Sequence, residues 1–304
     1  LTQEITVNGD DAIGQMGRGL KAFFDNLRKN IKQMATTAQT LASSSEEMTA
    51  VSQEMARELL DELDRFDDDP EDRVLLLTGT EPSFCSGANV RRFDRDIQER
   101  EAVSEEPDSL PWGRMEARLG TRERQDRALG ARVPLRIHDL QKPSIAAVNG
   151  HAVGLGMGLA LACDIRIASE KAVFSEAFVR MGLIPGDGSC WQLPRLVGLG
   201  NTLLLQYTGD RVDGAEAFRM GLVGRVVPHE ALMPAAMELA SRIARGATQS
   251  MSLIKYLVHR SLDTGLEESL ELAHVAQDIA RGTEDHKEAV QAFLEKREPR
   301  FKGR

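Results

Sequence analysis

The first part of the chain has apolar residues separated by three and then four positions, and it contains no proline from about Asp11 to Asp64. Asn30, Thr37 and Ser44 stand where an apolar residue would continue this heptad pattern. The pattern predicts a long helix that pairs with another helix in a coiled coil. About 50 residues of helix would extend about 75 Å, which favours a coiled coil over an amphipathic helix lying on its own domain.

The middle of the chain alternates between short apolar runs and helical patterns. Residues 73–78, 144–148 and 164–168 have the continuous apolar pattern of buried strands. A segment of small residues at 159–163 is predicted to be helical, and helical patterns dominate the later part of the chain. These observations predict an α/β fold with a helical C-terminal region over about residues 230–304.

Charge and composition narrow the class of protein. Residues 91–132 are about half charged with both signs mixed, which predicts an exposed insertion. The net charge of −9 argues against general nucleic-acid binding, and no segment approaches the roughly 20 apolar residues of a membrane span. Cys85, Cys163 and Cys190 lack a paired metal spacing. We therefore expect a cytoplasmic protein with no membrane segment in this chain and no bound metal.

A glycine-rich turn follows the second apolar run. Gly154, Gly156 and Gly158 open the small-residue helix, so backbone N–H groups and the positive end of the helix dipole face whatever lies in front. Their spacing differs from the dinucleotide-binding fingerprint. Two explanations stay open, which are close packing of helix on strand and polarisation of a carbonyl oxygen in an oxyanion hole.

A second turn of small residues follows the first apolar run, at residues 83–90. Small side chains at 85–88 would let a ligand approach the backbone, where Ala88 could supply another N–H group. Two N–H groups that converge on one oxygen suit an acyl enolate or a tetrahedral adduct.

From residue 84 onward, a series of motifs follows one characteristic order. These motifs are Phe84-Cys-Ser-Gly-Ala88, Lys142 to Asp164, Phe174 to Gly188, Leu193 to Gly198, Leu203 to Asp210, Gly221 to Pro228 and Ala292 to Lys302. The series resembles the crotonase family, the enoyl-CoA hydratases and isomerases, over about Met48 to Arg304. The resemblance implies a spiral of β-β-α units and a homo-oligomer, either a trimer or a dimer of trimers. It also implies a lyase or isomerase of fatty acid metabolism acting on an acyl-CoA, with coenzyme A as part of the substrate and no bound cofactor.

The same resemblance implies residues for the site. The backbone N–H groups of Ala88 and Leu155 would hold the thioester oxygen and stabilise an enolate. The residues expected to line the substrate are Met48, Ala50, Ser86, Gly87, Asn89, Val90, Ala152, Gly154, Gly158, Ala177, Phe178 and Gly186. The charged insertion stands where the family covers its acyl pocket.

The catalytic acids depart from the family pattern. Hydratases have two glutamates, at positions occupied here by Gly158 and Phe178. Hydration requires one group to activate water and another to deliver a proton. We therefore expect isomerisation rather than hydration, with Asp187 moving the proton. Some isomerases and dehalogenases of the family use an aspartate in this loop, usually at the position of Gly186. The alternative for Asp187 is a turn aspartate bonded to its own backbone.

Glu176 and His151 are further catalytic candidates. Glu176 lies two residues before Phe178, the position of the second family glutamate, and is therefore close enough to be considered. Alternation along a short strand, however, would direct its side chain to solvent. Histidine has an ordinary pKa of about 6.5, suitable for a base. In a packed turn, however, His151 would more often be a hydrogen-bonded structural residue.

The beginning of the chain has a resemblance of its own. Residues 11–18, 26–28 and 41–48 resemble the end of the HAMP linker and the signalling coiled coil of bacterial chemoreceptors. This implies a dimerising helix over 1–50, followed by a crotonase-like domain over 51–304. A rival function is therefore a helical signalling module with an inert crotonase domain. A third explanation, which fits the start of the chain at Leu1, is an artefact of gene fusion or of gene calling.

Overall fold

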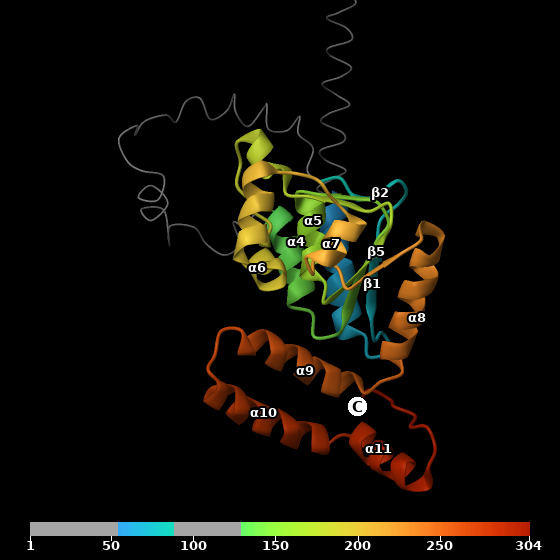
Figure 1. The fold of residues 1–304 in the computed structure, drawn as a ribbon. Helices are drawn as coiled ribbons and strands as arrows, with labels where there is room; N and C mark the ends of the chain where they lie inside the picture. Colours follow the sequence, from blue (N-terminus) through green and yellow to red (C-terminus); the bar gives the residue numbers. More distant parts are fainter. Residues whose placement is uncertain (1–53, 88–128) are drawn as a thin grey trace, which may run out of the picture. The chain divides into compact units, whose positions relative to one another are not determined.

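The computed structural model describes residues 54–87 and 129–304 (Figure 1). From Met55 onward, these residues belong to one compact unit. The predicted helix over 1–50 and most of the insertion at 91–132 lie outside the described residues. So do the predicted site residues Met48, Ala50, Ala88, Asn89 and Val90. No helix in the described ranges is both long and apolar enough to cross a membrane.

One sheet consists of four parallel strands in the order β1-β3-β5-β8. The strands are β1 (Leu75–Thr78), β3 (Ser144–Val148), β5 (Ile165–Ser169) and β8 (Arg225–Val227). All five residues of β3 are buried, because β3 has a neighbour on each side and helices pack on the sheet. The structure thus confirms the three strands predicted from apolar runs.

The second sheet has the order β2-β4-β6-β7. Its strands are β2 (Ser83–Cys85), β4 (His151–Val153), β6 (Val173–Ser175) and β7 (Val212–Asp213). β2, β4 and β6 are parallel, whereas β7 is antiparallel to β6. From β1 to β6, strands of the two sheets alternate along the chain, and each pair is followed by a helix, as in β3, β4 and then α5. This order confirms the α/β class and agrees with the expected β-β-α units.

The helices beside the sheets are α4 (Leu129–His138), α5 (Leu155–Ala162), α6 (Ser189–Thr208), α7 (Gly214–Arg219) and α8 (Leu232–Ala244). α5 packs against both α4 and α6 (Figure 1). A Cβ atom on Gly156 would lie 1.9 Å from the carbonyl oxygen of Cys85. Close packing, one of the two explanations for the glycine-rich turn, is therefore confirmed.

The helical C-terminal region predicted over about 230–304 is also confirmed, and after α8 it comprises α9 (Thr248–Ser261), α10 (Leu266–Arg281) and α11 (Glu284–Glu295). Lys255 of α9 contacts Asp164, with 3.0 Å between Nζ and Oδ2. Asp164 also accepts hydrogen bonds from the N–H and hydroxyl of Ser144, at 2.8 and 3.0 Å. Burial opposes its ionisation, but His259 and then the charge of Lys255 lower the pKa of Asp164 overall. This carboxylate therefore ties α9 to the start of β3.

Replacement of Asp164 by Asn should destabilise the fold. Lys255, whose side chain is only 11% exposed, would lose its counter-charge, and removal of one partner of a buried pair costs about 3–5 kcal/mol. Urea unfolding measures this loss of free energy. Because the pKa of Asp164 is lowered in the folded protein, its stabilisation is present near neutral pH and lost on acidification below about pH 4.

The exposed pair of Arg180 and Asp210 provides the control. Asp210→Asn should change the free energy of unfolding by less than about 1 kcal/mol. Equal effects of the two substitutions would contradict a special role for Asp164.

Candidate active site

The turn between β4 and α5 directs the first residue of the helix. Gly154 has a φ of 52°, which favours glycine, and its N–H donates to the carbonyl of Ser175 in β6 at 2.9 Å. Leu155 is the first residue of α5. The first N–H groups of a helix have no acceptor within it and lie at the positive end of its dipole. The Leu155 N–H is therefore placed to interact with negative charge.

The turn after β2 approaches the same helix end. β2 and β4 are parallel neighbours with Cys85 opposite Ala152, so their carboxyl ends lie at the same edge of the sheet. Gly87 has a φ of 90°, and a Cβ atom on it would lie 3.8 Å from the Leu155 nitrogen. The next residue, Ala88, is the second predicted N–H donor. The fold thus brings Leu155 together with the turn that leads to Ala88.

Asp187 places its carboxyl group beside α5. It follows η3 (Ala177–Met181) in the loop before α6, and it is 3% exposed. A Cβ atom on Gly158 would lie 2.4 Å from Oδ2 of Asp187 and 2.8 Å from its Cβ. Asp187 therefore fills the space that any side chain at position 158 would need. This space lies three residues beyond Leu155 along α5, so the carboxyl group is about one helical turn from the predicted oxyanion donor.

Glu176 is buried next to Asp187. It directly follows β6 and is 0% exposed, so the expectation that strand alternation directs it to solvent is wrong. The hydroxyl of Ser189 donates to Oε2 of Glu176 at 2.9 Å, and its backbone N–H donates to Oδ1 of Asp187 at 3.1 Å. Ser189 thus joins the two carboxyl groups. The N–H contact also confirms the turn-aspartate geometry for one oxygen of Asp187.

The other oxygen of each carboxyl group has no hydrogen-bond partner among the described residues, namely Oε1 of Glu176 and Oδ2 of Asp187. Burial, followed by the charge of Asp187, raises the pKa of Glu176 to about 8. Burial also raises the pKa of Asp187, although hydrogen bonds from Ser189 oppose this. At neutral pH, Glu176 is therefore mostly protonated, and Asp187 is a stronger base than an exposed aspartate.

Other predicted residues occupy less central positions. The Phe178 ring lies near the glycine turn, with its Cζ 3.6 Å from where a Cβ atom on Gly154 would be. His151 is exposed at the start of β4, and no contact joins it to the two carboxyl groups in the described ranges. Ala152 is buried, Ala177 is half-buried, and Ser86 and Gly186 are exposed. Ser189 was not predicted, although its position two residues after Asp187, at a helix start, is a usable signal.

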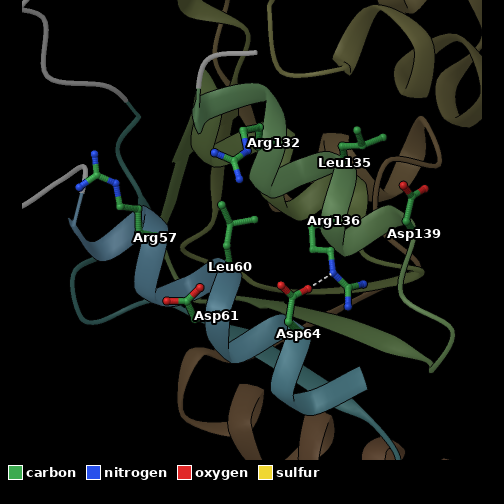
Figure 2. Close-up of a pocket in the computed structure, with 8 residues that line it drawn as sticks. All are labelled: Arg57, Leu60, Asp61, Asp64, Arg132, Leu135, Arg136 and Asp139. Atoms are coloured by element: carbon green, nitrogen blue, oxygen red, sulfur yellow. Dashed lines mark hydrogen bonds and ion pairs between the residues drawn. The ribbon is translucent and has the colours of Figure 1, made fainter. Parts of the chain in front are cut away.

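A cavity of about 330 Å³ lies between the helix over 54–68 and α4 (Figure 2). Arg136 of α4 points across it to Asp64 and also pairs with Asp67 at 3.1 Å. The remaining lining residues are Arg57, Leu60, Asp61, Arg132, Leu135 and Asp139. These ion pairs hold the helix over 54–68 against α4, which in turn packs against α5.

A second cavity, of about 660 Å³, lies between α4, α9 and the first turn of α6. In its lining, Nε2 of His138 is 3.3 Å from Nδ1 of His259, and the rings of His138 and Trp191 form a T-shaped pair. Burial, and then the neighbouring His259, lower the pKa of His138. No group of His, Cys, Asp and Glu within residues 54–87 and 129–304 is arranged to hold a metal ion.

Known proteins are similar to this chain in sequence and in fold. The sequence model of the enoyl-CoA hydratase/isomerase family matches residues 35–118 and 123–304. The crotonyl-CoA hydratase of Syntrophomonas wolfei is 35% identical over 255 residues, covering 84% of this chain and 90% of that protein. The 1,2-epoxyphenylacetyl-CoA isomerase of Escherichia coli is 34% identical over 266 residues, covering 85% and 92%. The crystal structure of an enoyl-CoA hydratase from Bacillus anthracis has a TM-score of 0.67 and 33% identity, covering 82% and 88%.

The contact between Gly158 and Asp187 can be tested by adding a methyl group. Gly158→Ala should force the Asp187 side chain out of its position and lower the free energy of unfolding by about 1–3 kcal/mol. In the double variant with Asp187→Gly, the space is open, so the two changes should be less than additive. Urea unfolding of all four proteins measures this coupling. Strictly additive effects would show that the two residues do not compete for space.

Proposed function

The chain belongs to the enoyl-CoA hydratase/isomerase family, and from this we propose that it isomerises an acyl-CoA thioester through an enolate in preference to hydrating it. The observation that supports isomerisation is the carboxyl group of Asp187 beside Gly158, the position at which the family resemblance implies a glutamate in hydratases. Coenzyme A enters as part of the substrate. The related hydratase and isomerase are about equally similar to this chain, so the preference rests on the site.

In the proposed mechanism, the thioester oxygen accepts hydrogen bonds from the backbone N–H groups of Leu155 and Ala88. The Leu155 N–H is at the N-terminus of α5, and the turn containing Gly87 approaches it. Fixed donors stabilise the negative charge that develops on this oxygen as the enolate forms. The dipole of α5 acts in the same direction.

Asp187 moves the proton between two carbon atoms of the acyl group. Its carboxylate removes a proton, the electrons of the broken C–H bond enter the enolate, and an O–H bond forms on Asp187. The proton then returns to a different carbon as the double bond shifts, so no other reactant is consumed. The raised pKa of Asp187 suits this task, because a base acts best when its pKa approaches the working pH.

Glu176 argues against hydration. A hydratase needs a second group to activate water or deliver a proton, whereas Glu176 is 0% exposed and its pKa is raised to about 8. Glu176 is therefore protonated at neutral pH and does not act as the base for a substrate water. The rival hypothesis of an inert domain is not favoured, because the described site retains a buried base beside a helix N-terminus.

We further propose a homo-oligomer that forms through the C-terminal helices. Large apolar side chains of this region are exposed, which is unusual for a surface in contact with water alone. They include Ile254, Val258, Leu266, Leu270, Ile279 and Phe293. We also propose that the acyl-CoA substrate is lined by residues of β4, of the two turns and of η3 and its loop, namely Ser86, Gly87, Ala152, Gly154, Ala177, Phe178 and Gly186.

Asp187→Asn tests the proposed base. The amide keeps the size of the side chain and an oxygen that can accept the Ser189 N–H, but it cannot remove a proton. Isomerase turnover of unconjugated enoyl-CoA thioesters should fall about 10²–10⁴-fold. The ultraviolet absorbance of the conjugated product measures this turnover. The exposed Asp210→Asn variant should retain full turnover. Unchanged turnover in Asp187→Asn would exclude Asp187 as the base, and rapid hydration of conjugated thioesters by the parent would exclude the preferred reaction.

A further inference from the structure

Glu176 has no direct part in the proton transfer proposed above, yet it is among the largest fully buried side chains of the described fold. Its only hydrogen-bond partner there is the hydroxyl of Ser189. In the described ranges, no Lys, Arg or His forms an ion pair with Glu176 or Asp187. An ionised carboxylate buried without a cation is strongly unfavourable, and two adjacent ones are more so. The pair is therefore unstable with two negative charges.

The hydrogen bonds indicate which of the two acids keeps the proton. Asp187 accepts the backbone N–H of Ser189, which can only donate and therefore favours the ionised carboxylate. Glu176 contacts the Ser189 hydroxyl, which can either donate or accept and is therefore compatible with a protonated acid. Each carboxyl group also has one buried oxygen without a partner, Oε1 of Glu176 and Oδ2 of Asp187. A proton on Glu176 avoids a second buried charge.

We propose that Glu176 and Asp187 hold a single proton between them, linked by Ser189, and that Glu176 is a positioning residue that keeps the pair at one negative charge. This rests on the proposed role of Asp187 as the base. When Asp187 removes the substrate proton, the pair becomes neutral as the enolate becomes negative. If Glu176 were ionised, a negative charge would remain near the enolate and oppose its formation.

The neighbouring elements have few other groups that titrate. α5 and β6 contain no titratable side chain. On α6, the thiol pKa of Cys190 is raised by burial and then by the charge of Glu176. On η3, Arg180 is exposed and pairs with Asp210. The ionisation of the pair therefore depends mainly on Glu176 and Asp187 themselves.

The pH dependence of kcat/KM tests the effect on turnover. For the parent, activity should fall as pH rises through about 8, where Glu176 ionises. Glu176→Gln keeps the shape of the side chain but cannot ionise. It should therefore remove this fall in activity at high pH, the basic limb of the pH profile, while losing less than about 10-fold in activity at neutral pH. The exposed Glu170→Gln is the matched control and should keep the limb. Ser189→Ala should shift the pH at which kcat/KM falls, and Ser189→Thr, which restores the hydroxyl, should return this pH to the parent value. A limb that persists in Glu176→Gln would overturn the proposal.

A stability measurement is independent of turnover. A glutamate whose pKa is raised by folding stabilises the protein below its usual pKa of about 4.3, and this stabilisation is lost as pH rises towards 8. Glu176→Gln should therefore remove part of the decline in Tm over this range. Should that variant not fold, Asp187→Asn removes the neighbouring charge and should move the end of the decline to lower pH, because burial alone then raises the pKa of Glu176.

The two measurements separate the inference from the proposed function. If the parent turns over no acyl-CoA but Glu176→Gln or Asp187→Asn changes the pH dependence of Tm, the shared proton stands and the proposed reaction fails. If neither variant changes the pH dependence of Tm, the shared proton is overturned even where Asp187 is essential for turnover.

Discussion

The close approach of α5 to the backbone and side chains around it is the constraint on which the candidate site depends. Gly156 allows the helix to lie against β2, and Gly158 leaves the space that Asp187 fills. At the other end, the buried Arg166 donates to the carbonyls of Cys163 and Leu222 at 2.6 and 2.8 Å. Because both ends are fixed by packing and hydrogen bonds, the N-terminus of α5 keeps a constant direction relative to the turn at Gly87.

The same packing explains why the carboxyl group comes from a loop rather than from α5. A glutamate on position 158 would collide with Asp187, so the two arrangements exclude each other. Asp187 is held by the backbone of the next helix through Ser189, and that residue also contacts Glu176. With its acid in the loop, at Asp187, the site has two buried carboxyl groups close together, Asp187 and Glu176. The consequence is electrostatic, since each group opposes ionisation of the other.

Local patterns predicted the strands at 73–78, 144–148 and 164–168, because continuous burial leaves a direct record in an apolar run. Contacts between distant segments leave no such record. Ser189 meets Glu176 across 13 positions, and the side chain of Lys255 reaches Asp164 only because α9 folds back onto β3. The direction of Glu176 was mispredicted for a local reason. β6 ends at Ser175, so strand alternation no longer applies at the following residue.

In the proposed mechanism, the number of ionisable groups that can reach the substrate decides the reaction. Hydration needs two separate proton-transfer groups, one for water and one for carbon. Of the two carboxyl groups at the site, Asp187 is the one that lies beside Gly158 of α5, whereas Glu176 is 0% exposed and contacts Ser189. Glu176 can adjust the charge of Asp187, but as the protonated member of the pair it does not take a proton from a water molecule on the substrate. One base acting in sequence on two carbon atoms is sufficient for isomerisation, so the protonation of Glu176 at neutral pH favours that reaction.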